Sequence, residues 1–356
     1  MKLVKLIFKA IGIVVGVLVL AALAFIGVLT ATEYKPEETE TLTVNGEASE
    51  SLSVGDELTV VSWNIGYGGL GEDADFFMDG GESVQSASKE LVNENLAGIA
   101  EELNALNADV IFLQEVDFDS KRSYHINELT TLDESLGDYT SAFAYNYKTL
   151  YVPYPIPPIG EVNAGLVTFS KYETTEATRV ALPCPFSYPI RLANLKRCLL
   201  VSRMPIEGTD AELVFINLHL EAYDDGEGKA QQTAQLRELI AEEIEAGNYV
   251  IAGGDFNQTF SNITTDVTPV ISEELWQPGV IDVSEFEGSE FCTDALVPSC
   301  RSLDCVLSES NPEEVQYYII DGFFVSKNLV VTSVETQDLN FEFSDHNPVC
   351  LKLKIQ

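Results

Sequence analysis

The sequence predicts an α/β fold, a sandwich of mixed β-sheets with helices on the outside. Three observations support this prediction. Helix-like and strand-like segments alternate in the first half of the globular part, and strand-like segments dominate the second half. Several strand-like segments are short, continuous apolar runs, the pattern of strands buried on both faces. Two longer segments have apolar residues at three- and four-residue steps, as in helices that pack one face on a sheet.

The composition limits the function classes that the chain can serve. Its 356 residues are enough for a sizeable core and for one or two domains. It has 57 acidic and 20 basic residues, a formal net charge of −37. Non-specific affinity for nucleic acid comes from Lys and Arg that neutralise phosphates, so this charge argues against a general nucleic-acid binder. It suits a soluble surface that attracts divalent cations.

The six cysteines are few for a chain of this length, and no Cys-x-x-Cys pair occurs among them. With only three histidines in the chain, the sequence does not favour a zinc site. Cys292, Cys300 and Cys305 fall in one loop-rich region. Disulfide bonds among them are an open alternative if the domain lies outside the cytoplasm, but spacing alone does not give their pairing.

Residues 1–31 have the composition of a membrane anchor. Residues 11–30 are uncharged and almost wholly apolar, and about 20 such residues span a bilayer as a helix. A secretory signal peptide has a shorter apolar core of roughly 7–15 residues. We therefore expect a retained anchor, with cleavage near residues 21–24 as the alternative.

The charges that flank this span predict its orientation. Lys2, Lys5 and Lys9 precede it, and a Glu-rich segment follows it. The positive-inside bias then places the N-terminus in the cytoplasm. We expect a single-pass protein of the cell membrane whose chain after Thr30 lies outside, with a linker at 32–55 and a globular domain at 56–356.

The first half of the globular part alternates strands and helices. A strand-like run at 58–63 ends at Asn64, which is followed by a glycine-rich turn. Residues 88–107 have the apolar spacing of a helix, and a serine at their start is a plausible N-cap. A continuous apolar strand then ends in Glu115. A carboxylate at the end of a buried strand needs a partner, either an arginine or a metal ion.

The second half carries more strands and further polar residues at their ends. We expect helices at 125–136 and 229–246. The remaining strand-like runs are 164–170, 198–203, 213–218, 249–252, 317–325 and 349–355. His219 directly follows one of these strands, Asp255 and Asn257 follow another, and Asp321 interrupts a third.

The segment 341–349 runs from an alternating strand-like pattern into a polar turn. Pro348 cannot donate a ladder hydrogen bond, so a strand breaks or restarts there. In a regular strand the side chains of Asp345 and His346 would point to opposite faces. They share one site only if the turn redirects them.

Each of these polar residues has an ordinary structural explanation when it is taken alone: a turn for Asn64, an ion pair for Glu115, a structural histidine for His219. Together they share a position at the end of an apolar strand, where α/β folds place their sites. Oxygen ligands suit Mg²⁺ or Mn²⁺, and histidines with a further carboxylate supply proton transfer.

Six short motifs resemble those of the endonuclease/exonuclease/phosphatase superfamily, which has the deoxyribonuclease-like fold. They appear in the family's order and cover residues 56–356. They are Ser62-Trp63-Asn64, Leu113-Gln114-Glu115-Val116, Asn217-Leu218-His219-Leu220, Gly254-Asp255-Phe256-Asn257, Ile320-Asp321-Gly322-Phe323-Phe324-Val325-Ser326 and Ser344-Asp345-His346-Asn347-Pro348-Val349. The resemblance implies a four-layered sandwich, two mixed sheets face to face with helices outside, and makes 56–356 a catalytic domain. With the anchor, the chain looks like a membrane-anchored member of bacterial type.

The resemblance also implies a metal site and phosphate contacts. Glu115 resembles the principal ligand of a divalent cation, supported by Asn64 and Asp345. The cation is usually Mg²⁺ in the family, with Mn²⁺ as an alternative. Arg197 begins the strand that leads toward the histidine motif, where relatives often keep a phosphate-binding arginine. Arg122 is a second candidate of the same kind.

The remaining motif residues match the family's catalytic groups. Asp255 and Asn257 resemble the pair that orients the attacking water and the phosphate. Asp321 resembles the carboxylate that orients His346 and fixes its tautomer. His219 resembles the other active-site histidine, which contacts the phosphate or protonates the leaving group. Which of Asp255, His219 and His346 acts as base or acid stays open.

Family members hydrolyse phosphoester bonds, so the expected activity is that of a metal-dependent phosphodiesterase or phosphatase outside the membrane. The anchor and the charge favour a small phosphorylated metabolite or a lipid headgroup as substrate. The alternatives are an extracytoplasmic Mg²⁺-dependent nuclease and a non-catalytic surface-binding protein on the same fold. Residues 147–159, rich in Pro and Tyr, are a packed loop, a substrate wall or a membrane-facing loop. We expect a monomer.

Overall fold

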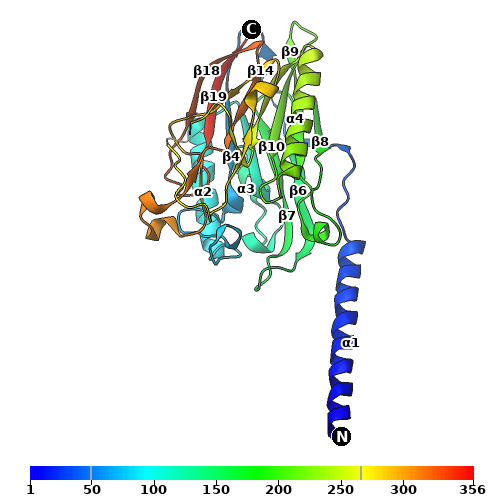
Figure 1. Ribbon diagram of the computed structural model, residues 1–356. Coiled ribbons are helices and arrows are strands. Elements are labelled where there is room, and N and C mark those ends of the chain that lie inside the picture. Colours follow the sequence, from blue (N-terminus) through cyan, green and yellow to red (C-terminus); the bar gives the residue numbers. More distant parts are fainter. Residues whose placement is uncertain (49, 265–266) are drawn as a thin grey trace.

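The computed structural model describes residues 1–48, 50–264 and 267–356. One long helix projects from a domain built of two β-sheets (Figure 1). The α-helices of the described residues are α1 (Lys2–Ala31), α2 (Lys89–Leu106), α3 (Glu128–Ser135) and α4 (Glu227–Glu245). The side chain of Ser88 accepts a hydrogen bond from the backbone N–H of Leu91 and so caps α2, as expected.

The strands form two large mixed sheets. The seven-stranded sheet has the order β18 (Leu329–Thr336), β19 (Val349–Ile355), β4 (Glu57–Asn64), β5 (Val110–Asp117), β7 (Gly160–Ser170), β6 (Thr140–Val152) and β2 (Val44–Asn45). The eight-stranded sheet has the order β1 (Thr39–Thr41), β8 (Glu176–Ala181), β9 (Cys198–Glu207), β10 (Glu212–His219), β11 (Tyr249–Asp255), β17 (Asp321–Ser326) and β14 (Ser289–Cys292), with β3 (Leu52–Ser53) beside β9. Parallel pairs, β4 with β5 and β10 with β11, make both sheets mixed.

Two short sheets complete the strands. In one, β12 (Gln258–Phe260) pairs with β13 (Gly279–Ile281), and in the other β15 (Cys300–Arg301) pairs with β16 (Tyr317–Tyr318). Apart from these elements, β14 and single 3₁₀ turns, the described residues between 260 and 315 are irregular.

The two large sheets face each other, and their side chains alternate between two environments. Val60 and Phe112 of one sheet meet Phe215 of the other in a central core. Val61 and Leu113, one residue further along, point outward into a second core under α2 and α3. This period of two is what buries both faces of these strands, and it explains their continuous apolar sequences.

A third core lies on the outer face of the eight-stranded sheet. Val214 and Ile216 point there, where Leu236 and Ile240 of α4 cover them. Helices therefore pack on both outer faces of the paired sheets (Figure 1). The predicted fold, two mixed sheets packed face to face with helices outside, is confirmed.

The predicted helices and apolar strands are present, but the sequence analysis did not predict the strands β6, β8 and β18 or the short strands β12, β13, β14 and β15, and it took one segment for a linker. β6, β8 and β18 lack a continuous apolar run, because each alternates or lies near a sheet edge. The segment 32–55, expected to be a linker, contributes β1, β2 and β3 to the two sheets. Its polar composition suits edge strands, which bury only part of their surface.

α1 is long and apolar enough to cross a membrane, and almost all of its residues are exposed. This fits membrane anchoring. Its last turns touch the domain: the Phe25 ring packs edge-on against the Tyr151 ring at 5.8 Å. The hydroxyls of Thr30 and Tyr188 lie 3.2 Å apart. α1 leaves the domain at the end opposite to the C-terminus (Figure 1).

Candidate active site

The motif residues meet in one cavity of about 640 Å³ at the end of the sandwich from which α1 leaves. Nine of the ten predicted site residues line it, and the tenth, Asp321, lies behind His346. Strand register explains part of this assembly. His219 at the end of β10 pairs with Asp255 at the end of β11, and Asp255 pairs with Asp321 at the start of β17. Three motifs distant in sequence therefore lie side by side across three strands.

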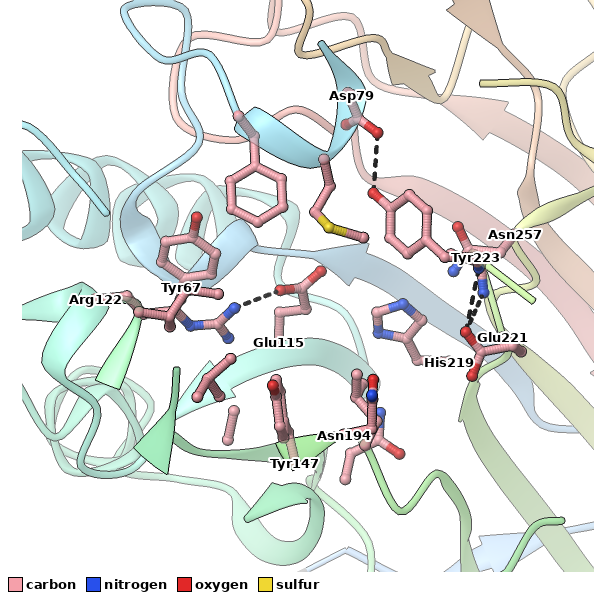
Figure 2. Close-up of a pocket in the computed structure, with 18 of the residues that line it drawn as sticks. Tyr67, Asp79, Glu115, Arg122, Tyr147, Asn194, His219, Glu221, Tyr223 and Asn257 are labelled. Atoms are coloured by element: carbon pink, nitrogen blue, oxygen red, sulfur yellow. Dashed lines mark hydrogen bonds and ion pairs between the residues drawn. The ribbon is translucent and has the colours of Figure 1, made fainter. Parts of the chain in front are cut away.

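Glu115 reaches the cavity because β5 is irregular at this point. The pairing of β5 with β7 shifts register between Leu113 and Val116, so that an extra residue bulges from the strand. Glu115 adopts a left-handed backbone with φ of 55°. Figure 2 shows its carboxylate directed toward the arginine Arg122, and Nη1 of Arg122 lies 3.5 Å from Oε2 of Glu115.

Asn64 connects two of the carboxylates. Its side-chain Nδ2 donates to Oε1 of Glu115 at 3.3 Å and to Oδ2 of Asp255 at 3.0 Å. Its Oδ1 accepts from the backbone N–H of Gly66 at 3.1 Å. In this arrangement the amide nitrogen of Asn64 faces the carboxylates, and its oxygen is turned to the Gly66 backbone.

The turn before β19 redirects the adjacent residues Asp345 and His346 so that both line the cavity. Ser344 holds this turn, because its hydroxyl donates to the carbonyl of Asn64 at 2.7 Å and accepts from the His346 N–H at 3.3 Å. Nδ1 of His346 lies 2.9 Å from Oδ2 of Asp321. Burial lowers the pKa of His346, but Asp321, Cys300 and Asp255 together outweigh it and raise that pKa well above the usual range.

His219 occupies a different environment. Its Nε2 lies 3.4 Å from Oδ2 of Asp255, and within the described part of the chain its buried Nδ1 has no hydrogen-bond partner. Burial, followed by the positive charges of Arg197 and His346, holds the pKa of His219 well below its usual range. The two histidines therefore favour opposite states, His219 neutral and His346 protonated.

Asp255 contacts several of the other site residues. Its Oδ1 accepts from the backbone N–H of Asn257 at 2.8 Å, and its Oδ2 lies 3.7 Å from Nε2 of His346. Burial raises the pKa of Asp255 to about 7, an effect that His346 opposes and the Asp321 carboxylate increases. Asn257 is held in place by donating from Nδ2 to the carbonyl of Leu220 at 2.9 Å.

Both predicted arginines line the cavity, and each is fixed by a buried carboxylate. Arg122 donates through Nε and Nη2 to the two oxygens of Asp117, at 3.2 and 3.0 Å. Its guanidinium also lies 3.7 Å from the centre of the Tyr67 ring. Arg197 donates to Oε2 of Glu221 at 3.2 Å and to the carbonyl of His219 at 3.0 Å.

The donor set fits a divalent cation. Four carboxylates converge on one region: Asp255, Asp321 and Asp345 are buried and Glu115 is partly exposed. Burying several carboxylates together is costly without positive charge. Burial raises the pKa of Asp345 to about 6, opposed by His346 and increased by the nearby Glu115. One oxygen each of Asp255 and Asp321 and one ring nitrogen of His346 also lie within 4.8 Å of one another. Hard oxygen donors of this kind are those that Mg²⁺ and Mn²⁺ prefer.

Several cavity residues are not among the sequence-predicted set. Glu221 follows His219 by two residues, so its place at the same strand end was a usable signal. Asp79 and Tyr223 also line the cavity, and the Tyr223 hydroxyl donates to Asp79 at 2.9 Å (Figure 2). Nothing in the local sequence joins these two residues, because the contact is made between distant loops.

The six cysteines, all of which lie in the described ranges, are free. Cys300 pairs with His346 in an isolated antiparallel β-bridge. The open alternative of a disulfide among Cys292, Cys300 and Cys305 is therefore absent from these described residues.

A sequence profile of the endonuclease/exonuclease/phosphatase family matches residues 61–346. Among solved structures, an endonuclease/exonuclease/phosphatase from Beutenbergia cavernae DSM 12333 superposes with a TM-score of 0.57 at 20% identity, over 84% of this chain and 72% of that one. An endonuclease/exonuclease/phosphatase from Bacteroides vulgatus superposes with a TM-score of 0.54 at 16% identity, over 85% of this chain and 100% of that one. An endonuclease/exonuclease/phosphatase family protein from Leptotrichia buccalis C-1013-b superposes with a TM-score of 0.51 at 15% identity, over 84% of this chain and 100% of that one. No functionally curated protein matches the chain.

At these identities the solved structures support the fold alone. The family profile, by contrast, covers most of the chain and contains all ten predicted site residues within its matched range. Those residues are also the ones that the fold brings together at one end of the sandwich. The chain therefore belongs to the endonuclease/exonuclease/phosphatase family.

Proposed function

We propose that the protein is a divalent-metal-dependent hydrolase of phosphoester bonds whose catalytic domain, residues 56–356, lies on the outer side of the cell membrane. The observation that carries this proposal is the alignment of His219, Asp255 and Asp321 across neighbouring strands, with His346 held on Asp321. Arg122 and Arg197 add fixed positive charge at the same cavity. Carboxylates for a cation, groups for proton transfer and cations for a phosphate are the parts that phosphoester hydrolysis needs.

Glu115 and Asp345, with Asn64 beside them, are the residues that would hold the cation. When bound, a divalent ion would neutralise charge on the phosphate and on the leaving oxygen. Asn64 contributes by orientation, because its amide donates to both Glu115 and Asp255. Mg²⁺ is our expectation and Mn²⁺ the alternative, since both favour oxygen donors.

The chain's own groups divide the proton transfers. A water attacks phosphorus, the bond to the leaving oxygen breaks, and Asp255 takes the proton of the water. A carboxylate that titrates near neutral pH suits this task. His346, kept protonated by Asp321, stabilises the negative charge that develops. His219, which lines the cavity beside Asp255, contacts the phosphate or the leaving oxygen, and Arg122 and Arg197 bind the phosphate oxygens.

The position of α1 and the charge of the chain support the location and the substrate class. Lys2, Lys5 and Lys9 precede the apolar helix, which favours an N-terminus in the cytoplasm and a domain outside. The net charge of −37 disfavours a long polyanion. A small phosphorylated metabolite or a lipid headgroup is thus the substrate we propose.

A substrate panel tests this assignment. The full chain is purified in detergent and assayed against a simple phosphodiester, inositol phosphates, phospholipid vesicles and duplex DNA, each with Mg²⁺, Mn²⁺ or chelator. We expect chelator-sensitive turnover of a lipid or small ester and little of DNA. Efficient DNA cleavage would establish a nuclease instead. Metal binding without turnover of any phosphoester would favour a non-catalytic binding protein.

A further inference from the structure

We propose that the mouth of the cavity docks on the same lipid bilayer that α1 enters, so that the site acts on phosphoester headgroups presented at the membrane surface. This inference rests on the proposed function for its substrate and on the position of α1 for its docking surface.

The last two turns of α1 form part of the cavity wall. Phe25, Ile26 and Leu29 line the same cavity as His219 and His346. At a rise of 1.5 Å per residue, Phe25 lies about 7.5 Å before Thr30 along the helix. Glu33 is the first charged residue after Thr30. A bilayer that α1 spans therefore reaches the wall of the cavity itself.

Polar contacts fix the domain against the end of α1. The Tyr188 and Thr30 hydroxyls lie 3.2 Å apart. Just past the helix, the carboxylate of Glu33 pairs with Nε of Arg191 at 3.1 Å and with Nζ of Lys196 at 3.7 Å. The segment that carries Tyr188 and Arg191 is thus held at the level where the chain leaves the hydrocarbon, and it cannot swing freely on a linker.

Four large side chains project from the two loops beside this junction, and we call them the apolar rim: Tyr154, Ile156, Tyr188 and Ile190. Their exposed fractions are 67%, 94%, 52% and 59%. Tyr154 and Ile190 also line the cavity, whereas Ile156 and Tyr188 lie outside it. Tyrosine is enriched at membrane interfaces, and exposed isoleucines there bury apolar surface that is costly in water.

The segments that carry the apolar rim lack the acidic residues that are common in the rest of the chain, as suits contact with a lipid surface. The chain has 57 acidic residues in 356, about one in six. The two segments that carry the apolar rim, 139–160 and 177–206, contain none over 22 and 30 residues. They carry Lys148, Arg191 and Lys196 instead. These two segments of an otherwise acidic protein therefore add no carboxylates that anionic headgroups would repel, and Glu33 beside them is paired with Arg191 and Lys196.

The cavity has a polar region and an apolar region, as a site for a lipid headgroup requires. The catalytic groups provide a polar, charged region, and Val152, Tyr154, Ile159 and Leu192 provide apolar wall. A phosphate bound by the arginines can keep its diester-linked glycerol against this wall while the acyl chains stay in the bilayer. A volume of about 640 Å³ accommodates a headgroup but not whole acyl chains as well.

The docking is tested by fluorescence on the full chain, reconstituted in vesicles of phosphatidylcholine and phosphatidylglycerol with brominated acyl chains. Ile156→Trp is compared with Val54→Trp, after subtraction of the wild-type signal. Val54 is 53% exposed, and the neighbouring Gly55 bonds to Ile355 at the opposite end of the domain. We expect several-fold stronger quenching at 156. Equal quenching at the two positions would overturn the docking, whatever the activity.

The substrate is tested by turnover. Ile156→Ser/Tyr188→Ser is compared with Val54→Ser on phosphatidylglycerol vesicles and on a soluble phosphodiester. Because the double variant removes two apolar side chains from the docking surface, we expect its turnover on vesicles to fall about tenfold or more relative to Val54→Ser. Turnover of the soluble ester should stay unchanged. Equal rates on vesicles for both variants would contradict the proposal. Quenching at 156 without hydrolysis of either ester would refute the proposed function and leave the docking supported.

Discussion

Oδ2 of Asp321 lies 2.9 Å from Nδ1 of His346, and both side chains are buried. Asp321 begins β17 and His346 lies in the turn before β19, and the turn held by Ser344 brings His346 onto the carboxylate. The second ring nitrogen of His346 then faces Asp255, at 3.7 Å. Asp321 thereby fixes the tautomer, the orientation and the charge of the imidazole.

This pair predicts a graded loss of activity. His346→Ala should lower kcat by on the order of 10²–10⁴, the usual range for a group in acid–base catalysis. Asp321→Asn should cost less, because the ring remains but loses its countercharge. Since the two act as a unit, the double variant should be no slower than His346→Ala alone. Additive losses would show that Asp321 acts separately from His346.

The other histidines provide a matched comparison. His219→Ala should also lower kcat by on the order of 10²–10⁴, since its imidazole lines the cavity beside Asp255. His125 is half-exposed and pairs with Asp119 on the surface at 2.6 Å. His125→Ala should leave steady-state rates unchanged. Wild-type turnover by His219→Ala would remove this residue from the mechanism.

Arg197 should act on substrate binding. Arg197→Gln is made together with Glu221→Gln, so that no unpaired carboxylate remains buried. A hydrogen bond to a charged group contributes about 1.5–3 kcal/mol, so KM should rise about tenfold to a hundredfold. Arg237→Gln, which removes a surface ion pair with Glu285, serves as the control. An unchanged KM in the double variant would exclude Arg197 from phosphate binding.

The buried carboxyl group of Glu128 should make the stability of the folded protein depend on pH. It is fully buried at the start of α3 and accepts the Asp117 N–H at 2.8 Å. Burial, then the Asp117 carboxylate, raises its pKa well above the ordinary 4.5. The unfolded chain ionises Glu128 near its ordinary pKa while the folded chain does not, so the stability linked to this group is present below that pH and is lost as the pH rises.

Glu128→Gln removes this titration and keeps a neutral group of similar shape. The stability of the variant relative to wild type should therefore increase from pH 4 to pH 7.5. Urea unfolding of the detergent-solubilised full chain measures this difference at both pH values. Glu101→Gln, an exposed change on α2, is the control. A difference that stays constant with pH would show that Glu128 is ionised in the folded protein.

Much of the site could be predicted from sequence because its residues follow apolar strands. His219 and Asp255 end such strands, and parallel pairing aligns them directly. The Asp345–His346 pair was also predictable, since an alternating pattern breaks into a turn before Pro348. α2 and α4 follow from apolar spacing alone.

The parts that could not be predicted depend on contacts between distant segments. Residues 32–55 lack an apolar pattern, yet they form β1, β2 and β3 because existing strands offer free edges. The Asp79–Tyr223 contact joins two loops without a shared motif. The amide direction of Asn64 depends on the backbone of Gly66, which the sequence does not position.

The proposed function requires that Glu115 and its neighbours bind a cation that supports phosphoester hydrolysis. The most direct test of this requirement is a Mg²⁺ titration of soluble phosphodiester hydrolysis by wild type, Glu115→Gln and the surface control Glu101→Gln. We expect chelator-sensitive activity in wild type and in the control. We expect Glu115→Gln to have a lower rate at limiting Mg²⁺ and to need more metal. The same rate and the same metal dependence in all three proteins would contradict it.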